Sequence, residues 1–194
     1  MSKSRHTAIR SAPNHADRKQ KITEATLHQI ALGGVDSVTF RKVAEIAAVP
    51  LGSTTYYFEA RNDLIEQAFI QHLRNTSTRA ASLNPAQGHR ADGDMIDYLV
   101  ELVRLEVKDE ALIVVDQELF LYAARSEAVS TALKEWQGIV VSQIARALEA
   151  SGVQQPFETA TTLLHLIRGF ELDHITRQDP SLEQLKLRLR NTIE

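Results

Sequence analysis

Hydroxyl-bearing side chains cluster at residues 50–58, where the sequence reads PLGSTTYYF. Hydroxyl groups donate hydrogen bonds to phosphate oxygens and meet base edges, and a glycine lets a nucleic-acid backbone approach closely. The cluster therefore predicts a surface that contacts DNA. Its candidate residues are Gly52, Ser53, Thr54, Thr55, Tyr56 and Tyr57. Phe58 has no polar atom and is predicted to pack in a core, which is also the alternative for the two tyrosines.

A second group of polar side chains interrupts the apolar segment ALIVVDQELFLYAA at residues 111–124. Polar groups inside a helical core need partners, and in a ligand-binding core they can hold the polar end of a ligand. The alternative is hydrogen bonding within the protein, or a side of the helix that reaches solvent. The candidate ligand-binding set is Asp116, Gln117, Glu118, Tyr122, Trp136, His165 and Arg168. The apolar residues around it predict an apolar or amphipathic small-molecule effector.

Metal and catalytic chemistry find no support in the residue pattern. The chain has no cysteine, which excludes disulfides and thiolate metal sites. Glu171, Asp173 and His174 are metal-capable types, but their angular spread on a helix does not converge on one ion. Neither a Ser-His-Asp order nor a glycine-rich phosphate or dinucleotide motif is present. We therefore expect no metal, no cofactor and no enzyme activity.

The charge of the chain is unevenly distributed. Residues 1–62 carry a net charge of +4 and the remainder carries −7, which is the asymmetry expected when one end of a protein meets a polyanion. The alternative is ordinary scatter of surface charge. No apolar run reaches the roughly 18 residues of a membrane span, and the N-terminus lacks the apolar centre of a secretory signal. We therefore expect a cytoplasmic protein with no membrane partner.

Three short helices are predicted to position the hydroxyl cluster. After a flexible basic arm at residues 1–17, an apolar face that begins at Arg18 predicts a helix, which the glycine pair 33–34 ends. Thr39 is a candidate N-cap of a second helix, and Pro50 stops that helix and opens a third of about two turns. This arrangement is a helix-turn-helix unit, whose second helix is the one presented to a major groove.

Beyond this unit the sequence shows only helical periodicity. A longer helix from Asp63 is predicted to connect the unit to the rest of the chain. The last helix is predicted to begin at Asp179 and Pro180, or alternatively at Ser181. The predicted fold is all-α. Its parts are an arm at 1–17, a helix-turn-helix DNA-binding domain at 18–62, and a helical ligand-binding and dimerisation domain at 63–194.

Residues 22–65, ITEATLHQIALGGVDSVTFRKVAEIAAVPLGSTTYYFEARNDLI, resemble the DNA-binding domain of the tetracycline-repressor (TetR) family of transcriptional regulators. The matching residues are Ala25, Gly34, Thr39, Val43, Ala44, Val49, Gly52, Tyr56, Phe58, Asp63 and Leu64. The resemblance implies an all-helical homodimer that represses transcription until a small molecule binds. It also implies that residues 52–57 form the recognition helix and that Thr39 meets a phosphate. Arg41 and Lys42 would lie in the first turn of the second helix, and Arg61 would occupy a phosphate-binding position.

Apolar residues in the last two helices also favour a homodimer, since a terminal hairpin should not leave so much apolar surface exposed. They are Leu164, Ile167, Phe170, Leu182, Leu185, Leu189 and Ile193. Two-fold symmetry would place two recognition helices one turn of DNA apart and predicts a palindromic, double-stranded operator.

Two differences from the family pattern keep a second interpretation open. Thr55 stands where many members have a tyrosine, and Ala60 stands where many have a hydroxyl cap. The alternative is an all-helical sensor or adaptor of the same shape, which acts through protein contacts without specific DNA binding.

Overall fold

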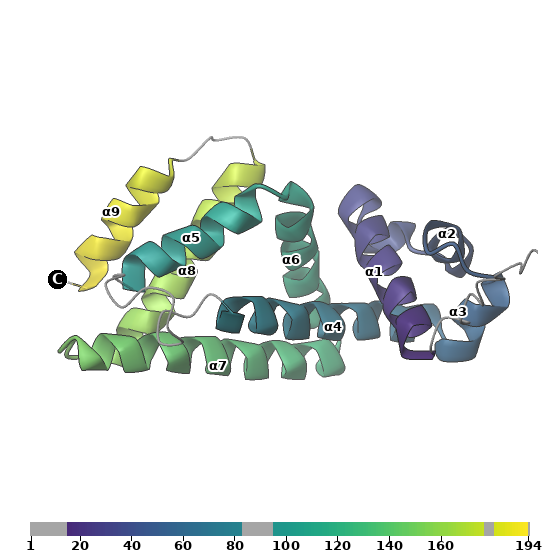
Figure 1. The fold of residues 1–194 in the computed structure, drawn as a ribbon, viewed down its shortest axis with the longest axis horizontal. Coiled ribbons are helices and arrows are strands. Elements are labelled where there is room, and N and C mark those ends of the chain that lie inside the picture. Colours follow the sequence, from purple (N-terminus) through teal and green to yellow (C-terminus); the bar gives the residue numbers. More distant parts are fainter. Residues whose placement is uncertain (1–14, 83–94, 177–180, 194) are drawn as a thin grey trace, which may run out of the picture.

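The computed structural model describes residues 15–82, 95–176 and 181–193, and these form nine α-helices and one short 3-10 helix (Figure 1). The elements are α1 (His15–Gly33), η1 (Val35–Ser37), α2 (Phe40–Ile46), α3 (Leu51–Tyr57), α4 (Arg61–Ser82), α5 (Met95–Val107), α6 (Glu110–Ala123), α7 (Glu127–Ala150), α8 (Pro156–Ile175) and α9 (Leu182–Ile193). No strand occurs in these three ranges, and the predicted all-α class is confirmed.

Helices α1, α2 and α3 form one end of an elongated molecule, and we call them the head (Figure 1). Helix α4 leaves the head and runs beside α7, the longest helix. Helix α6 stands between the head and α5, while α8 and α9 complete the opposite end. The head is therefore joined to the larger helical part by α4 in the chain and by packing against α6 in space.

Short-range signals in the sequence set the ends of the head helices. Gly34 ends α1 with φ 72° and ψ 173°, a backbone conformation that is essentially restricted to glycine. Thr39 caps α2 as predicted, because its hydroxyl oxygen accepts a hydrogen bond from the Lys42 amide at 3.3 Å. The turn before α3 contains Ala48 with φ 52°, and Pro50 precedes the first residue of α3. These features give the predicted helix-turn-helix unit.

Two helices begin earlier than predicted: α1, and α4, which begins at Arg61 and not at Asp63. Helix α1 begins at His15, three residues before the predicted start, so residues 15–17 belong to the helix and not to the arm. Residues 1–14, with the rest of the predicted arm, lie outside the described residues, as do Asp179 and Pro180. Ser181 directly precedes α9, and its hydroxyl accepts from the Glu183 amide at 3.2 Å.

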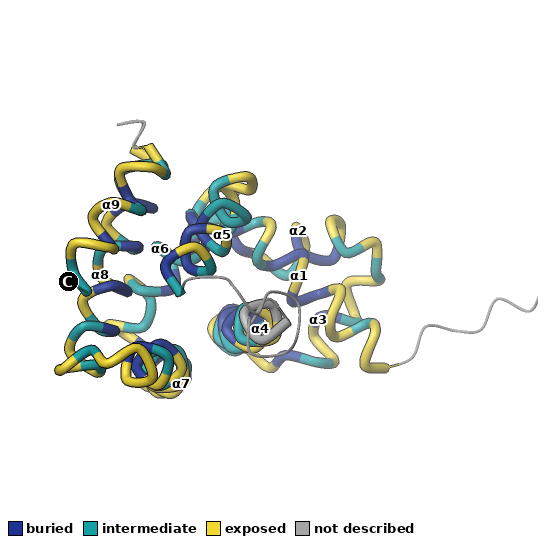
Figure 2. Tube along the Cα trace, turned by 60° about the vertical axis from the view of Figure 1, so that its left-hand side comes forward, coloured by how far each residue is buried: buried dark blue, intermediate teal, exposed yellow. Residues whose placement is uncertain are grey.

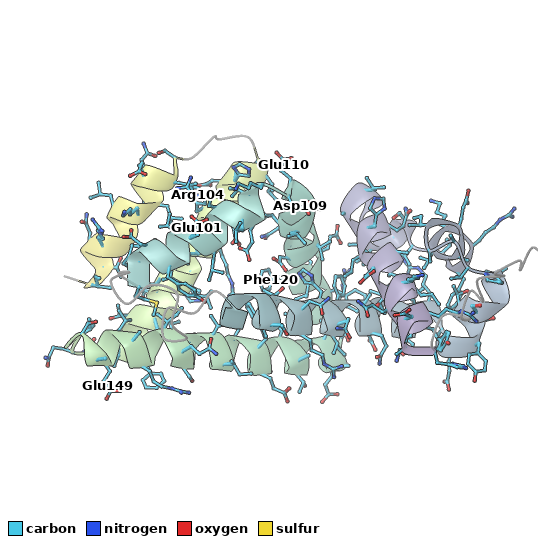
Figure 3. All side chains as sticks on the ribbon, in the orientation of Figure 1. Glu101, Arg104, Asp109, Glu110, Phe120 and Glu149 are labelled. Carbon is cyan, nitrogen blue, oxygen red and sulfur yellow. The ribbon has the colours of Figure 1, made fainter. Side chains whose placement is uncertain are left out.

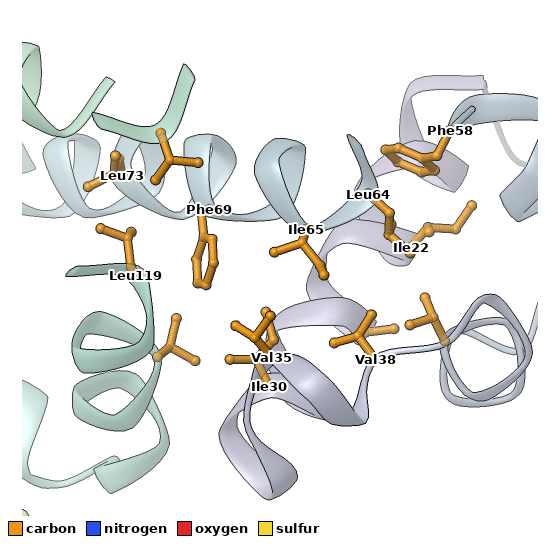
Figure 4. Close-up of a cluster of buried hydrophobic side chains, with 14 of the residues drawn as sticks. Ile22, Ile30, Val35, Val38, Phe58, Leu64, Ile65, Phe69, Leu73 and Leu119 are labelled. Carbon is orange, nitrogen blue, oxygen red and sulfur yellow. The ribbon is translucent and has the colours of Figure 1, made fainter. Parts of the chain in front are cut away.

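The first buried cluster fills the head and continues between the helices that pack against it, α4 and α6 (Figure 4). Phe58 is 1% exposed and lies in this cluster as predicted. Leu64, Ile65 and Phe69 extend from α4 towards the head, and Leu119 joins them from α6. One continuous core therefore holds α1–α3, the first half of α4 and part of α6 in a fixed arrangement.

The second buried cluster lies among α5, α7, α8 and α9. It corrects the argument for a dimer interface, because five of the residues expected to be exposed are buried within the chain: Leu164, Ile167, Phe170, Leu185 and Leu189. Their helices pack on α5 and α7, which cover this apolar side. The outer sides of α8 and α9 carry the exposed positions (Figure 2), among them Leu172 at 47% and Leu187 at 61% exposure.

Candidate DNA-binding face and effector cavity

The exposed side of α3 carries three of the predicted DNA-contacting residues. Tyr56 is 73% exposed, and Gly52 and Thr55 are also exposed. A Cβ atom added at Gly52 would meet no heavy atom within 4 Å, so a larger residue is not excluded by the protein itself. Arg41 and Lys42 are exposed in the first turn of α2, next to the Thr39 cap. The head thus presents hydroxyls and cations from two neighbouring helices.

A groove of about 410 Å³ lies where the start of α1 meets α3. Its lining residues are His15, Arg18, Pro50, Gly52, Ser53, Tyr56 and Tyr57. The Tyr57 hydroxyl and His15 Nδ1 are 2.8 Å apart in a hydrogen bond, and the Tyr56 and Tyr57 rings meet edge to face. Sequence reasoning missed His15, because the residue pattern places it in the arm and only the position of α1 brings it to α3.

Two residues that are predicted to contact DNA already have hydrogen-bond partners within the protein. Thr54 is fully buried, and its hydroxyl donates to the Leu51 carbonyl at 2.7 Å, so it faces neither phosphate nor base. Arg61 donates to the Val38 carbonyl at 2.8 Å and the Val35 carbonyl at 2.5 Å. The expectation for Thr54 needs correction, because this residue packs in the head. The Arg61 guanidinium holds the segment between α1 and α2 and stays partly exposed, so its phosphate contact remains a prediction.

A partly enclosed cavity of about 90 Å³ lies among α4, α5, α6, α7 and α8. Its walls are largely apolar, and its polar or charged lining residues are Thr76, Glu106, Asp116, Trp136, Arg168 and Glu171. Of the predicted ligand-binding residues, Asp116, Trp136 and Arg168 are in this lining. Figure 3 labels Phe120, which contributes an aromatic wall from α6. The cavity is the candidate effector site.

Glu171 and Glu106 form a carboxyl pair in the wall of this cavity. Glu171 on α8 is only 6% exposed, and its side chain shares a hydrogen bond with Glu106 on α5. Burial, followed by the charge and hydrogen bond of Glu106, raises the pKa of Glu171 to about 10. The pair therefore holds a proton at neutral pH. Sequence reasoning missed this pair, considering Glu171 only as a metal-capable residue.

Arg168 is the cation of the cavity wall, and its guanidinium already has partners. It lies over the Phe120 ring, 4.6 Å from the ring centre. With the Gln137 amide oriented so that its oxygen faces the guanidinium, that oxygen accepts from Arg168 at 2.7 and 3.2 Å. Burial lowers the pKa of Arg168, and the nearby Glu171 and Asp116 oppose that change. Arg168 is thus a packed wall group.

Asp116 connects the cavity to α4. Its Oδ1 atom is 2.7 Å from Nε2 of His72, which is buried on α4. Leu73 and Thr76, also on α4, line the cavity beside this contact. A ligand that reached Asp116 would therefore act on a residue whose partner belongs to the connecting helix.

Four predicted ligand-binding residues lie away from the cavity lining. Tyr122 packs against Phe69 with ring centres 5.4 Å apart in the first buried cluster. His165 is exposed on α8. Glu118 points to the head, where its Oε2 atom accepts from the Val35 amide at 3.4 Å. Gln117 is not in the lining either, and its Nε2 atom is buried without a hydrogen-bond partner.

Metal clusters and membrane-spanning helices are both absent from the described parts of the chain. In residues 15–82, 95–176 and 181–193, no group of three or more His, Asp or Glu residues could hold a metal ion. Among the same residues, no helix combines the length and apolarity needed to cross a bilayer. The carboxylates of the cavity therefore do not make a recognisable metal site.

Known proteins share this fold and arrangement. A transcriptional regulator from Rhodococcus sp. Rha1 superposes with a TM-score of 0.76 at 18% identity, covering 90% of this chain and 93% of that chain. A TetR-family member from Streptomyces coelicolor A3 is 26% identical with a TM-score of 0.73, covering 92% and 99%. The multidrug binding protein EbrR complexed with proflavin is 27% identical with a TM-score of 0.66, covering 91% and 99%.

Sequence comparison gives a family assignment. No protein with a curated description matches the chain. The family model described as "Tetracyclin repressor-like, C-terminal domain" matches residues 90–194, which is more than half of the chain. The chain therefore belongs to the tetracycline-repressor (TetR) family of transcriptional regulators.

Proposed function

We propose that this TetR-family regulator represses transcription by binding a palindromic operator as a homodimer, and that a small molecule in the α4–α8 cavity releases it. The course of α4 carries this proposal. Leu64, Ile65 and Phe69 in its first half pack into the core of the head, while Leu73 and Thr76 in its second half line the cavity. A movement of α4 caused by a ligand would therefore move the head.

The size of the cavity favours such a movement. A volume of about 90 Å³ holds only about three water molecules, whereas ligand pockets usually measure at least about 300 Å³. An effector would therefore bind better to a state in which α4, α6 and α8 lie further apart. Differential affinity of this kind shifts the population towards the state that binds the ligand.

Complexes of EbrR support a small, partly apolar effector. This protein has been crystallised with proflavin and with ethidium, at 27% and 26% identity to this chain. Both compounds are aromatic and carry polar groups. The cavity here combines apolar and aromatic walls with a few charged side chains, which is the composition that such compounds need.

The dimer proposal depends on the outer sides of α8 and α9. Leu172 and Leu187 are exposed there and would be covered by a second copy of the chain. Two-fold symmetry would then set two α3 helices about 34–36 Å apart on DNA. Light scattering at micromolar concentration is expected to give the mass of two chains, and the mass of one chain would contradict the dimer.

Fluorescence anisotropy with DNA from upstream of the protein's own gene tests the regulator function. Specific binding should exceed binding to random DNA and weaken steeply with salt, because phosphate contacts release counterions. Tyr56→Phe should weaken binding by about threefold to tenfold, which corresponds to one lost hydrogen bond. Tyr98→Phe is the matched control, since Tyr98 packs in the second buried cluster, away from the head.

A negative result at that DNA would be followed by selection from a random DNA pool. Failure to enrich any sequence would contradict the regulator function and favour a sensor or adaptor that acts through protein contacts. The burial of Thr54 inside the head is the observation that keeps this alternative relevant.

A further inference from the structure

The carboxyl pair of Glu171 and Glu106 is an unusual feature for the interior of a helical cavity. Carboxylates rarely lie buried without a cation, because removal of the charge from water is costly. Here Glu171 is buried and its hydrogen-bond partner is a second carboxyl group. A shared proton makes this arrangement possible, and whatever supplies positive charge could take the place of that proton.

The charged groups around Glu171 come from several helices. Glu106 faces it from α5, Asp116 from α6 and Arg168 from its own helix, α8. The α4 and α7 lining residues, among them Thr76 and Trp136, carry no charge, although His72 of α4 contacts Asp116. No α9 residue belongs to the lining. Acidic groups therefore outnumber basic groups three to one in the lining.

We propose that the effector of this protein is an organic cation with an apolar body, whose positive charge displaces the proton held between Glu106 and Glu171. The proposal rests on the effector site proposed above. On binding, the carboxyl group of the pair loses its proton to solvent, and the resulting carboxylate faces the ligand cation. The charge within the cavity stays constant through this exchange, since one positive charge leaves as another enters.

The other charged groups make an anionic effector a poor fit. An anion would need Arg168, but that guanidinium lies over Phe120 and faces Gln137. An anion would also approach three acidic side chains. A cation meets acidic groups and the aromatic ring of Trp136, and aromatic rings attract quaternary ammonium groups.

Phenyltrimethylammonium and tert-butylbenzene provide a direct test. They have the same shape and differ in the central atom, which is charged nitrogen in one and neutral carbon in the other. Trp136 is the only tryptophan of the chain and lines the cavity, so its fluorescence reports binding. At about pH 8.5 we expect the cation to bind about tenfold more tightly or better, because one charge is paired on binding.

The pH dependence of binding identifies the proton exchange. Affinity for phenyltrimethylammonium should rise by about tenfold or more between about pH 6.5 and about pH 8.5, because one proton is released on binding. Affinity for tert-butylbenzene should stay constant over this range. Glu171→Gln should remove both the pH dependence and the preference for the cation. Glu106→Gln is a second variant of the same pair. Glu149→Gln is a charge-matched control, because Glu149 is exposed near the end of α7, does not line the cavity, and lies well away from the lining residue Phe120 (Figure 3).

The outcomes separate this inference from the proposed function. Equal binding of both probes, tighter binding of tert-butylbenzene, or an unchanged preference in the Glu171→Gln and Glu106→Gln variants would overturn the cation assignment and leave the cavity as an effector site. Absence of binding by both probes would also overturn it, and operator binding measured on the same sample would then show whether the regulator function stands.

Discussion

The two buried regions of this protein treat polar side chains in opposite ways. In and around the head, Thr23, Thr26 and Thr54 are buried, and each hydroxyl donates to a carbonyl of its own helix at 2.7–2.8 Å. In the cavity, Glu171 is also buried, at 6% exposure, but it shares a proton with Glu106. The buried hydroxyls of the head region thus have hydrogen-bond partners in their own helices, whereas the cavity holds ionisable carboxyl groups among apolar side chains.

This difference indicates that the two regions have different functions. A core with satisfied polar groups holds one arrangement, which suits the exact placement of α3 against a DNA groove. A buried carboxyl pair lowers the stability of the folded protein at high pH, and a ligand that pairs with the carboxylate would remove part of this unfavourable free energy. Removal of apolar volume from the first region and of charge from the second tests this contrast.

Phe58→Ala is expected to have the largest effect. Phe58 is 1% exposed in the first cluster and lies under the Lys19 ammonium, 5.7 Å from the ring centre. Loss of the ring should lower the free energy of unfolding by about 3–5 kcal/mol. Urea denaturation measures this change, and operator binding should fall with it. Leu51→Ala, at a residue that is 50% exposed, should change stability by less than about 0.5 kcal/mol.

Glu171→Gln should stabilise the protein at high pH. A glutamate carboxyl in water has an ordinary pKa of 4.5, whereas the pKa of Glu171 in the folded protein is about 10, so the folded state holds an additional proton between these values. The free energy of unfolding of the wild type therefore falls as pH rises through this window. Thermal unfolding at about pH 9 should show the variant about 1–3 kcal/mol more stable, with little difference near pH 4. A variant that is less stable than the wild type at high pH would show that the Glu171 carboxylate stabilises the folded protein, and this would contradict the proposed difference between the two regions.

The sequence predicts the head better than the cavity, because the structure of the head depends on residues that are close together in the sequence. The Thr39 cap depends on a spacing of three residues and the Phe58 assignment on the lack of a polar atom, and both predictions are confirmed. The DNA contact predicted for Thr54 is wrong, because Thr54 lies four residues, about one helical turn, before the buried Phe58 and is buried with it. That spacing is itself a signal in the sequence for the buried position.

The cavity depends on contacts between distant parts of the chain. Glu106 and Glu171 belong to α5 and α8, and no local pattern shows that they meet. One signal is present: Glu171 continues the helical stripe of Leu164 and Ile167, where an apolar residue is expected. The spacing of Asp116 and Glu118 is a second signal. Residues two apart on a helix do not face the same side, so only one of these two side chains is expected to reach the cavity.

Gly34→Ala tests the contact between the two regions. Gly34 has φ 72°, and an added Cβ would lie 3.0 Å from Oε1 of Glu118 on α6. Strained backbone and this close approach should lower the free energy of unfolding by about 1–2 kcal/mol in thermal or urea unfolding. Gly152→Ala is the control, because Gly152 has φ 84° but open space at its Cβ position. Equal losses in both variants would show that the Glu118 contact adds nothing to the backbone strain.

Gly52→Ala should have the smallest effect on folding and the opposite effect on DNA binding. The Cβ would meet nothing within 4 Å, and alanine favours a helix more than glycine does, so the free energy of unfolding should rise by about 0.5–1 kcal/mol. A DNA backbone that approaches α3 closely would meet the added methyl group, and operator affinity should fall by about tenfold, or about 1.4 kcal/mol. Urea unfolding and fluorescence anisotropy on the same preparation separate the two effects. A more stable variant that retains full operator affinity would show that DNA does not approach this position, and the recognition surface would then have to be sought on the α2 side of the head.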